Sequence, residues 1–212
     1  NSKDYKENMI MIKNIVEACK KEKIKKLILL SSMSAKRSHP DAYGRNKLLI
    51  EKIVKNSGLN YTILRASIIY GKGSNSFNFI IDNMNKVPFL TPIIGNGKYK
   101  INPVCIKDVI NAIEKCVENK TTDKNDYDIS GGENIQFIQL INELKKEKNI
   151  RKKNVFLPIK FCELIALFLP RMISRENIKN LTEDTKANTE KARRDFGYNP
   201  IKFSEGAKNG IL

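Results

Sequence analysis

Residues 26–71 read KLILLSSMSAKRSHPDAYGRNKLLIEKIVKNSGLNYTILRASIIYG, and this segment carries most of the information about the fold class. It opens with four apolar residues, Leu27 to Leu30, that run directly into Ser31 and Ser32. Such a run predicts a strand that is buried on both faces and carries hydroxyl groups at its carboxyl end. Ligands of open α/β sheets bind at that end, so we expect the functional site there.

A helical pattern follows the polar loop that contains Pro40. It begins near Asp41 and stops at Ser57-Gly58. Its apolar stripe consists of Leu49, Ile50, Ile53 and Val54. Tyr43 and Lys47 lie on this helix, four residues or about one turn apart, so their side chains are expected to project side by side.

A phenol and an ammonium group at this spacing point to acid–base chemistry. A tyrosine with an ordinary pKa near ~10 is a poor proton-transfer group at neutral pH, and a neighbouring cation favours its phenolate form. We therefore expect Lys47 to lower the pKa of Tyr43. The hydroxyl of Ser32 would hold a substrate oxygen near this phenol, for proton transfer coupled to hydride transfer with a nicotinamide. Ser34 is the alternative hydroxyl, and either serine also suits a turn that bonds nearby backbone.

Three segments carry a resemblance to a known family. KLILLSSMSA, YGRNK and LNYTILRASIIYGKG resemble the second half of an extended short-chain dehydrogenase/reductase, the NAD-dependent epimerase/dehydratase family. The similarity continues through GNGKYKINPVCIKDV and YDISGGENIQFIQLI to FGYNP, so it covers nearly the whole chain. It implies an α/β fold, namely the C-terminal part of a Rossmann-like, doubly wound parallel sheet with a small α/β substrate-binding region.

The resemblance also implies roles for individual residues. Ser32, Tyr43 and Lys47 match the catalytic serine, tyrosine and lysine, and Tyr43 and Lys47 also contact the cofactor, with Lys47 on the nicotinamide ribose. The cofactor is NAD or NADP. The backbone that would bond the nicotinamide carboxamide is that of Ala66, Ser67, Ile68 and Ile69. Ala66 stands where the family usually has proline, which leaves a less constrained turn.

One departure from the family bears on the substrate. Many nucleotide-sugar epimerases and dehydratases carry an arginine for the substrate diphosphate seven residues before the aspartate that matches Asp108. Ile101 occupies that position here. Lys100 lies beside it, but adjacent residues of an extended segment face opposite sides. The KYKINPV segment resembles the branch that includes complex I accessory-subunit relatives, so a nucleotide sugar is a weaker expectation without being excluded.

The predicted domain organisation depends on a glycine motif that this sequence lacks. The chain starts at Asn1 and has no Gly-x-Gly-x-x-Gly string, the motif that cradles a dinucleotide pyrophosphate. We expect an N-terminally truncated chain that lacks the first βαβ units, exposes an unpaired sheet edge and is inactive alone. Residues 1–71 are predicted to form a partial NAD(P)-binding Rossmann domain. Residues 72–212 are predicted to form a mixed substrate-binding region interleaved with the remaining Rossmann elements.

The charge is strongly basic, with 39 Lys and Arg against 23 Asp and Glu in 212 residues and a net charge of +16. The lysines are scattered along every predicted helix, and no basic block is interleaved with aromatic residues. We therefore expect no nucleic-acid partner. Attraction of an anionic substrate or a cofactor phosphate is the better explanation of the positive electrostatic potential. The expected partner is a small-molecule substrate, with a homodimer as a further option.

The cysteines and the single histidine do not indicate a metal site. Cys19, Cys105, Cys116 and Cys162 show no C-x-x-C spacing, and His39 has no second ligand near it. This pattern suits a cytoplasmic protein without disulfides or zinc.

The longest apolar stretch is residues 161–169, interrupted by Glu163 and closed by Pro170. It is far shorter than the ~20 residues of a membrane span, so no transmembrane segment is predicted. A core or interface helix is the simplest interpretation, and an interfacial helix in peripheral contact with a membrane is the alternative.

Other elements follow from periodicity and turn residues. Helices are predicted over residues 4–20, 77–85, 135–144 and 189–196. Strands are predicted within residues 60–69, ending at Arg65, and over residues 126–130 and 154–157. Asp108 is interpreted as the N-cap of a helix, and Gly197 as a left-handed cap. Arg65 either ends its strand near the cofactor or simply pairs with a carboxylate.

The predicted function is that of an NAD(P)-dependent oxidoreductase, epimerase or dehydratase acting on a nucleotide sugar or another hydroxyl or keto substrate. The alternative is a non-catalytic dinucleotide-binding protein of the same fold with an assembly or regulatory role. Retention of Ser32, Tyr43 and Lys47 favours the enzyme, because a structural holder needs no proton-transfer group.

Overall fold

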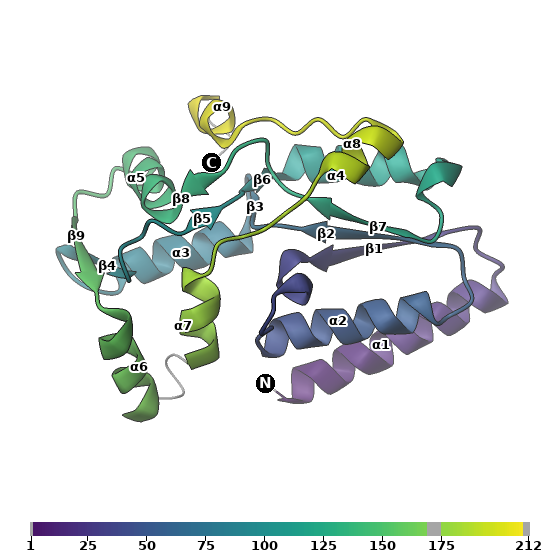
Figure 1. Cartoon of the computed structure of the whole chain (residues 1–212), viewed down its shortest axis with the longest axis horizontal. Helices are drawn as coiled ribbons and strands as arrows, with labels where there is room; N and C mark the ends of the chain where they lie inside the picture. Colours follow the sequence, from purple (N-terminus) through teal and green to yellow (C-terminus); the bar gives the residue numbers. More distant parts are fainter. Residues whose placement is uncertain (1, 169–174, 210–212) are drawn as a thin grey trace. The chain divides into compact units, whose positions relative to one another are not determined.

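The computed structural model describes residues 2–168 and 175–209 (Figure 1). The described residues form two compact units, and the chain passes between them several times. The first unit draws on residues 1–67, 108–130 and 187–199, and the second on residues 68–107, 131–186 and 200–212.

A three-stranded parallel sheet in the order β1-β2-β7 is the centre of the first unit. Its strands are β1 (Leu27–Ser32), β2 (Tyr61–Ala66) and β7 (Asn125–Ile129). Ser32 ends β1 opposite Ala66 of β2, which in turn lies opposite Ile129 of β7. The three carboxyl ends therefore meet at one edge of the sheet, and the predicted α/β class with parallel strands is confirmed.

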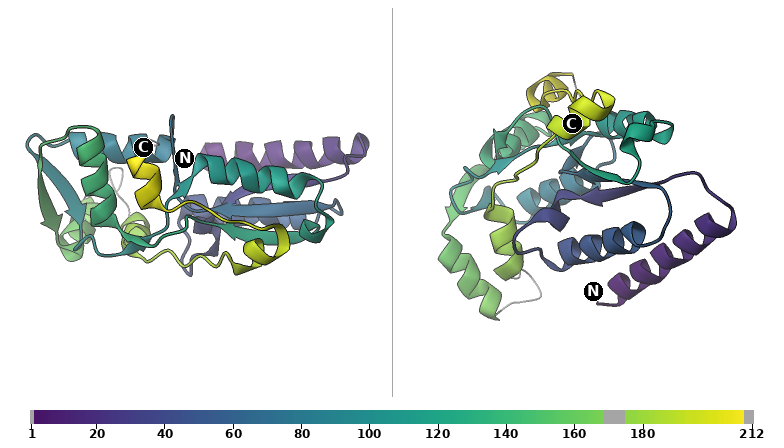
Figure 2. Two further views of the ribbon diagram at one scale, coloured as in Figure 1. Left: turned by 90° about the horizontal axis from the view of Figure 1, so that it is seen from above. Right: turned by 45° about the vertical axis from the view of Figure 1, so that its right-hand side comes forward.

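Helices cover both faces of this sheet (Figures 1 and 2). The helices α1 (Ser2–Lys21) and α2 (Ala42–Lys55) lie on one face, and α4 (Ile106–Val117) and α8 (Glu190–Phe196) on the other. Two 3₁₀ turns, Met33–Lys36 and Lys120–Thr122, complete the unit. Gly197 ends α8 with a φ of 65°, in the left-handed conformation predicted for it.

The core beneath α2 explains how the strand residues are oriented. Buried Ile12, Ile50 and Val54 pack with Leu27 and Leu29 of β1. Because strand side chains alternate between faces, Ser31 points to the same side as Leu27 and Leu29, toward α2. Ser32 is the last residue of the strand and also the N-cap of the 3₁₀ turn that follows it.

The second unit contains three short strand pairs, five helices in its described part, and its own core. The pairs are β3 (Ile69–Tyr70) with β6 (Val104–Cys105), β4 (Leu90–Ile94) with β9 (Lys153–Leu157), and β5 (Lys100–Ile101) with β8 (Ile135–Gln136). The helices are α3 (Asn75–Asn85), α5 (Phe137–Glu147), α6 (Ile159–Phe168), α7 (Arg175–Thr182) and α9 (Phe203–Lys208). Tyr70, Phe77 and Leu140 are at the centre of the core.

A smaller cluster attaches α6 and α7 to the β4-β9 pair. Cys162, Ala166 and Ile178 are buried there, with Ile94 and Leu157 packed against them. Cys162 and Ala166 are four residues apart, so they define one face of α6. Residue 169, the end of the predicted apolar stretch, lies outside the described residues.

Three sequence predictions need correction. The strand that begins at Leu27 is not buried on both faces as predicted, because β1 is an edge strand of the described sheet and Leu30 is 38% exposed. The next strand, predicted to end at Arg65, is β2 and ends one residue later at Ala66, and β3 then pairs with β6 in the second unit. Asp108 is not an N-cap, since α4 begins at Ile106, directly after β6. Asp108 instead lies in the first turn, where its negative charge is favoured by the helix dipole.

Candidate functional site

A tight turn at the end of β1 places the predicted serine. Ser32 is the N-cap of the 3₁₀ turn, and its Oγ accepts a hydrogen bond of 3.2 Å from the backbone N–H of Ser34. The turn residues Met33 and Ala35 are buried and hold it against the unit. The Ser32 hydroxyl is thereby fixed at the carboxyl edge of the sheet.

The start of α2 packs closely against this turn. Asp41 caps the helix by accepting a hydrogen bond of 2.8 Å from the N–H of Gly44. A Cβ atom on Gly44 would lie 2.4 Å from the carbonyl oxygen of Ser34 and 2.9 Å from Cβ of Pro40. Only glycine fits at this position, which explains on steric grounds why the second residue of the YGRNK segment is Gly44. The close approach brings Tyr43, the neighbour of Gly44, to the strand end.

Tyr43 and Ser32 are brought together by this packing, as predicted. Burial has the largest effect and raises the pKa of Tyr43, a hydrogen bond with the Ser32 side chain lowers that pKa, and the negative charge of Asp41 raises it further. The net result is a pKa above the ordinary value for tyrosine. Tyr43 is nevertheless 48% exposed, so about half of the residue is accessible from solvent.

Lys47 lies one turn from Tyr43 but does not act on it as predicted. Its Nζ atom is 5.7 Å from the centroid of the Tyr43 ring, over the ring face. Burial lowers the pKa of Lys47, and the negative charge of Glu51 opposes that shift. The prediction that Lys47 lowers the pKa of Tyr43 is therefore wrong for this structure, because the ammonium group lies over the ring and desolvation of the phenol dominates.

A buried ion pair between Glu51 and Arg65 links the elements that position Ser32 and Tyr43. This pair was not predicted from the sequence. Glu51 lies two turns after Tyr43 on α2 and is 1% exposed. Its carboxylate accepts a hydrogen bond of 2.6 Å from Ser31 and is held by Nε and Nη2 of Arg65 at 3.0 and 2.7 Å. It thereby joins α2 to both β1 and β2. The sequence contained one signal of this ion pair. Glu51 lies between Ile50 and Val54, within the apolar stripe of the predicted helix.

The ion pair extends across the sheet to β7. Nη1 of Arg65 is 2.5 Å from Asp126 and 4.0 Å from Asp128, and Lys36 of the 3₁₀ turn is 2.7 Å from Asp128. Burial alone would raise the pKa of Asp126, but the charges of Arg65 and Lys55 hold it below its ordinary value. Arg65 thus pairs with carboxylates, one of the two interpretations left open by the sequence.

The backbone predicted to bind the nicotinamide carboxamide is partly engaged within the chain. The N–H of Ser67 donates to the carbonyl of Ile129 at 2.9 Å, and the carbonyl of Ile68 accepts from the N–H of Val104 at 2.9 Å. The carbonyl of Ile69 accepts from Oγ of Ser74 at 2.7 Å. Ala66 is the last residue of β2. The cofactor role of residues 66–69 stays a prediction.

The described residues form neither a metal cluster nor a membrane-spanning helix. No cluster of three or more His, Cys, Asp or Glu residues suited to a metal ion occurs within residues 2–168 and 175–209. None of the helices described there has the length and apolar character needed to cross a membrane. All four cysteines are free thiols.

Comparisons with known proteins agree with the fold. Residues 1–87 match the model of a family described as NAD(P)H-binding. Prestalk A differentiation protein A of Dictyostelium discoideum is 25% identical over 201 residues, which cover 91% of this chain and 62% of that protein. The mitochondrial NADH dehydrogenase [ubiquinone] 1 alpha subcomplex subunit 9 of the same organism is 27% identical over 110 residues, 52% of this chain and 30% of that protein. The chain thus spans less than two thirds of either relative.

Solved structures share the same architecture. The UDP-glucose 4-epimerase of Thermotoga maritima, solved with UDP-glucose, superposes with a TM-score of 0.74 at 23% identity, over 99% of this chain and 70% of that one. The UDP-glucuronic acid 4-epimerase of Bacillus cereus, solved with UDP-glucuronic acid and NAD, superposes with a TM-score of 0.71 at 23% identity, over 96% and 66%. The chain therefore has the Rossmann-like fold of the NAD-dependent epimerases and dehydratases, the extended short-chain dehydrogenases/reductases, and its residues 1–87 match the NAD(P)H-binding family.

Proposed function

We propose that this protein is an NAD(P)-dependent oxidoreductase, epimerase or dehydratase in which Tyr43, Lys47 and Ser32 perform the proton chemistry. The observation that carries the proposal is the meeting of Ser32 and Tyr43 at the carboxyl edge of a parallel sheet, with Lys47 one turn away. Ligands of such folds bind at that edge. A match to an NAD(P)H-binding family over residues 1–87, which contain all three residues, supports the same cofactor.

The donor set fits a dinucleotide. Tyr43 is half exposed, and Lys47 presents an ammonium group that makes no ion pair within the part of the chain that the structure describes. Lys47 would hold the ribose hydroxyls by donating hydrogen bonds, as an ammonium group has three donors and no acceptor. The bound nicotinamide would supply the hydride acceptor or donor.

Tyr43 would move the proton at the substrate oxygen. Its raised pKa keeps the phenol protonated at neutral pH, so the residue is set to donate a proton to a carbonyl oxygen as that oxygen gains charge. In the opposite direction Tyr43 would accept the proton of a substrate hydroxyl, which requires a cation close enough to favour the phenolate. Ser32 would hold the same substrate oxygen beside the phenol. Tyr43 and Ser32 thus act on one atom.

The substrate class is a secondary alcohol or the matching ketone. A nucleotide sugar remains a candidate because two of the structural neighbours were solved with UDP-sugars. Ile101, at the position where such enzymes often carry an arginine for the diphosphate, instead packs against the core of the second unit. A substrate without a diphosphate is therefore the better fit to this chain.

A second candidate is a non-catalytic dinucleotide-binding subunit of a larger assembly. The observation that favours it is the 27% identity to an NADH dehydrogenase subunit over 52% of the chain. The two candidates differ in turnover, not in cofactor binding.

Cofactor binding by the full-length protein tests what the two candidates share. Titration with NADH and NADPH, followed by nicotinamide fluorescence, should give saturable binding of at least one of them. Lys47→Ala should weaken it by at least tenfold. The matched control is Lys52→Ala, an exposed lysine on the same helix, which should bind as the wild type does. Equal affinity of the two variants would contradict the role of Lys47.

Turnover then separates the candidates. The wild type should reduce or oxidise the cofactor with at least one member of a panel of ketones, secondary alcohols and UDP-sugars. Saturable cofactor binding without turnover of any panel member would favour the assembly role. No binding of either nucleotide would contradict both.

A further inference from the structure

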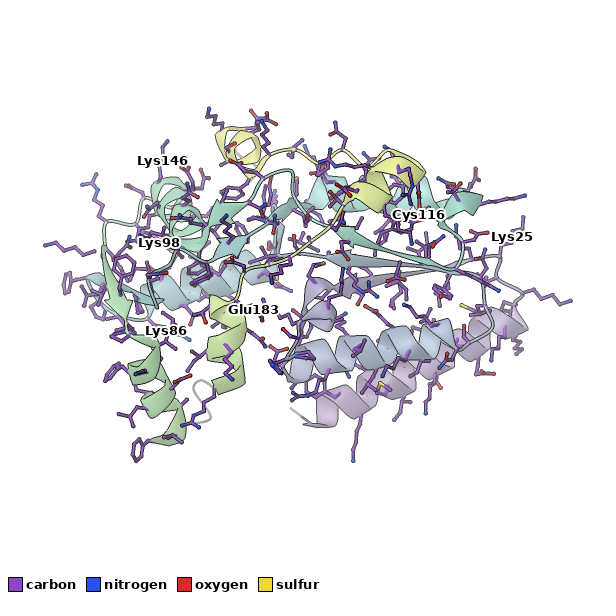
Figure 3. All side chains as sticks on the ribbon, in the orientation of Figure 1. Lys25, Lys86, Lys98, Cys116, Lys146 and Glu183 are labelled. Carbon is purple, nitrogen blue, oxygen red and sulfur yellow. The ribbon has the colours of Figure 1, made fainter. Side chains whose placement is uncertain are left out.

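The solvent-facing side of α6 is apolar, where a surface helix is normally polar. Cys162 and Ala166 face the core of the second unit and fix which side of the helix is inward. The opposite side carries Phe161, Leu164 and Phe168, which are 50%, 51% and 77% exposed. Side chains project from α6 on the side away from α7 (Figure 3). A helix that is apolar on both sides has a second apolar environment to face.

The charges around this apolar face are mainly free cations. Lys160 lies on α6 itself, and Arg175 and Lys179 lie on α7, which packs against α6. Lys98 lines the same shallow surface depression as Ile159, the first residue of α6. None of these four cations is in an ion pair within residues 2–168 and 175–209.

Three acidic side chains lie near the same face. Asp184 is exposed and accepts a hydrogen bond of 2.6 Å from the backbone N–H of Lys100, and Glu183, which is partly buried, also has a partner. Glu163 is partly buried on the flank of α6. The four cations are all exposed, whereas only one of these three carboxylates is, in a chain whose net charge is +16.

We propose that the apolar face formed by Phe161, Leu164 and Phe168 docks on an anionic phospholipid bilayer. The helix has 10 residues, too few to span a bilayer, but enough to lie in the interface with its aromatic and aliphatic side chains among the acyl chains. Lys160, Arg175 and Lys179 would meet the acidic headgroups, each basic residue near such a surface adding attraction. The proposal is independent of the proposed catalytic function.

A tryptophan probe tests it directly, because the chain contains no tryptophan. Phe161→Trp should show a blue-shifted emission when phosphatidylcholine–phosphatidylserine vesicles, at a molar ratio of about 3 to 1, are added. Phosphatidylcholine vesicles alone should give little shift, and high salt should weaken the response to the anionic vesicles. The matched control is Ile10→Trp on α1, an apolar residue that is 60% exposed in the first unit, which should show no shift. An equal shift at both positions would overturn the assignment to α6.

Vesicle flotation of the unlabelled protein gives the second readout. Phe161→Ser/Leu164→Ser/Phe168→Ser should reduce the bound fraction at least tenfold, while Ile10→Ser should leave it unchanged. All substituted side chains are at least half exposed, so thermal unfolding should stay close to that of the wild type. If the triple variant unfolds, Phe168→Ser alone should still give a several-fold loss.

Three results would overturn the proposal. They are no flotation with anionic vesicles, wild-type flotation of the triple variant, and a wild-type dimer in light scattering that the triple variant abolishes. The last result would assign the face to a second copy of the chain.

Discussion

Glu51→Gln is the substitution whose effect the structure defines best. Glu51 is almost fully buried, and its carboxylate is shared between Ser31 and Arg65. Glutamine keeps the size of the side chain but removes the negative charge. Arg65, itself only 8% exposed, would keep Asp126 as its remaining close carboxylate.

The magnitude follows from these contacts. Breaking a buried ion pair by removing one partner costs about 3–5 kcal/mol. Because Asp126 stays 2.5 Å from Nη1 of Arg65 and the glutamine can still accept one hydrogen bond, we expect a cost at or just below the low end of this range, about 2–3 kcal/mol. With a urea dependence of about 2–3 kcal/mol/M, the midpoint of urea unfolding should fall by about 1 M.

The assay is urea unfolding at neutral pH, followed by circular dichroism. The matched control is Glu17→Gln, which breaks an exposed pair with Lys20 at 3.0 Å on α1. Such exposed pairs contribute about 0–1 kcal/mol, so its midpoint should barely move. Equal midpoints for the two variants would refute the reasoning that the Glu51–Arg65 pair holds α2 to the sheet.

Further predictions concern the helix ends and the sheet. Gly44→Ala should destabilise the chain by about 1–3 kcal/mol in thermal or urea unfolding, because its Cβ would meet the backbone of the 3₁₀ turn at 2.4 Å, and wild-type stability would contradict that packing. Gly197→Ala should cost about 1 kcal/mol, because its φ of 65° is strained for alanine, although the added Cβ would only come into ordinary contact with Nζ of Lys115 at 3.8 Å. An unchanged midpoint would count against the left-handed cap. Asp126→Asn should be less stable than the wild type at pH 7. The folded-state pKa of Asp126 is depressed, so its contribution is present above about pH 4 and is lost as the pH falls through the folded pKa, and the gap should narrow at lower pH. If the difference in stability between the wild type and Asp126→Asn stayed the same at every pH, this would contradict the depressed pKa of Asp126.

The sequence predicted the parts of the site that depend on local pattern. The apolar run before Ser32 became β1, Asp41 caps α2, and the four-residue spacing placed Lys47 over the ring of Tyr43. Each of these depends on neighbours in the chain, so periodicity and capping rules were sufficient.

Features that depend on tertiary packing were not predictable. Glu51 and Arg65 are 14 residues apart, and only the packing of α2 on the sheet shows that they pair. The raised pKa of Tyr43 likewise results mainly from burial, which a helical spacing does not reveal. The pairing of β3 with β6 follows from the passage of the chain between units at Ser67, a property of the topology.

Proton transfer by the hydroxyl of Tyr43 during turnover is the step on which the proposed function depends. The most direct measurement compares the single-turnover rate of cofactor reduction or oxidation in the full-length wild type and Tyr43→Phe, with a substrate that the wild type converts. Removal of a positioned general acid–base group is expected to lower the rate by about 10²–10⁴-fold while cofactor affinity changes little. The same rate in both proteins would contradict the account.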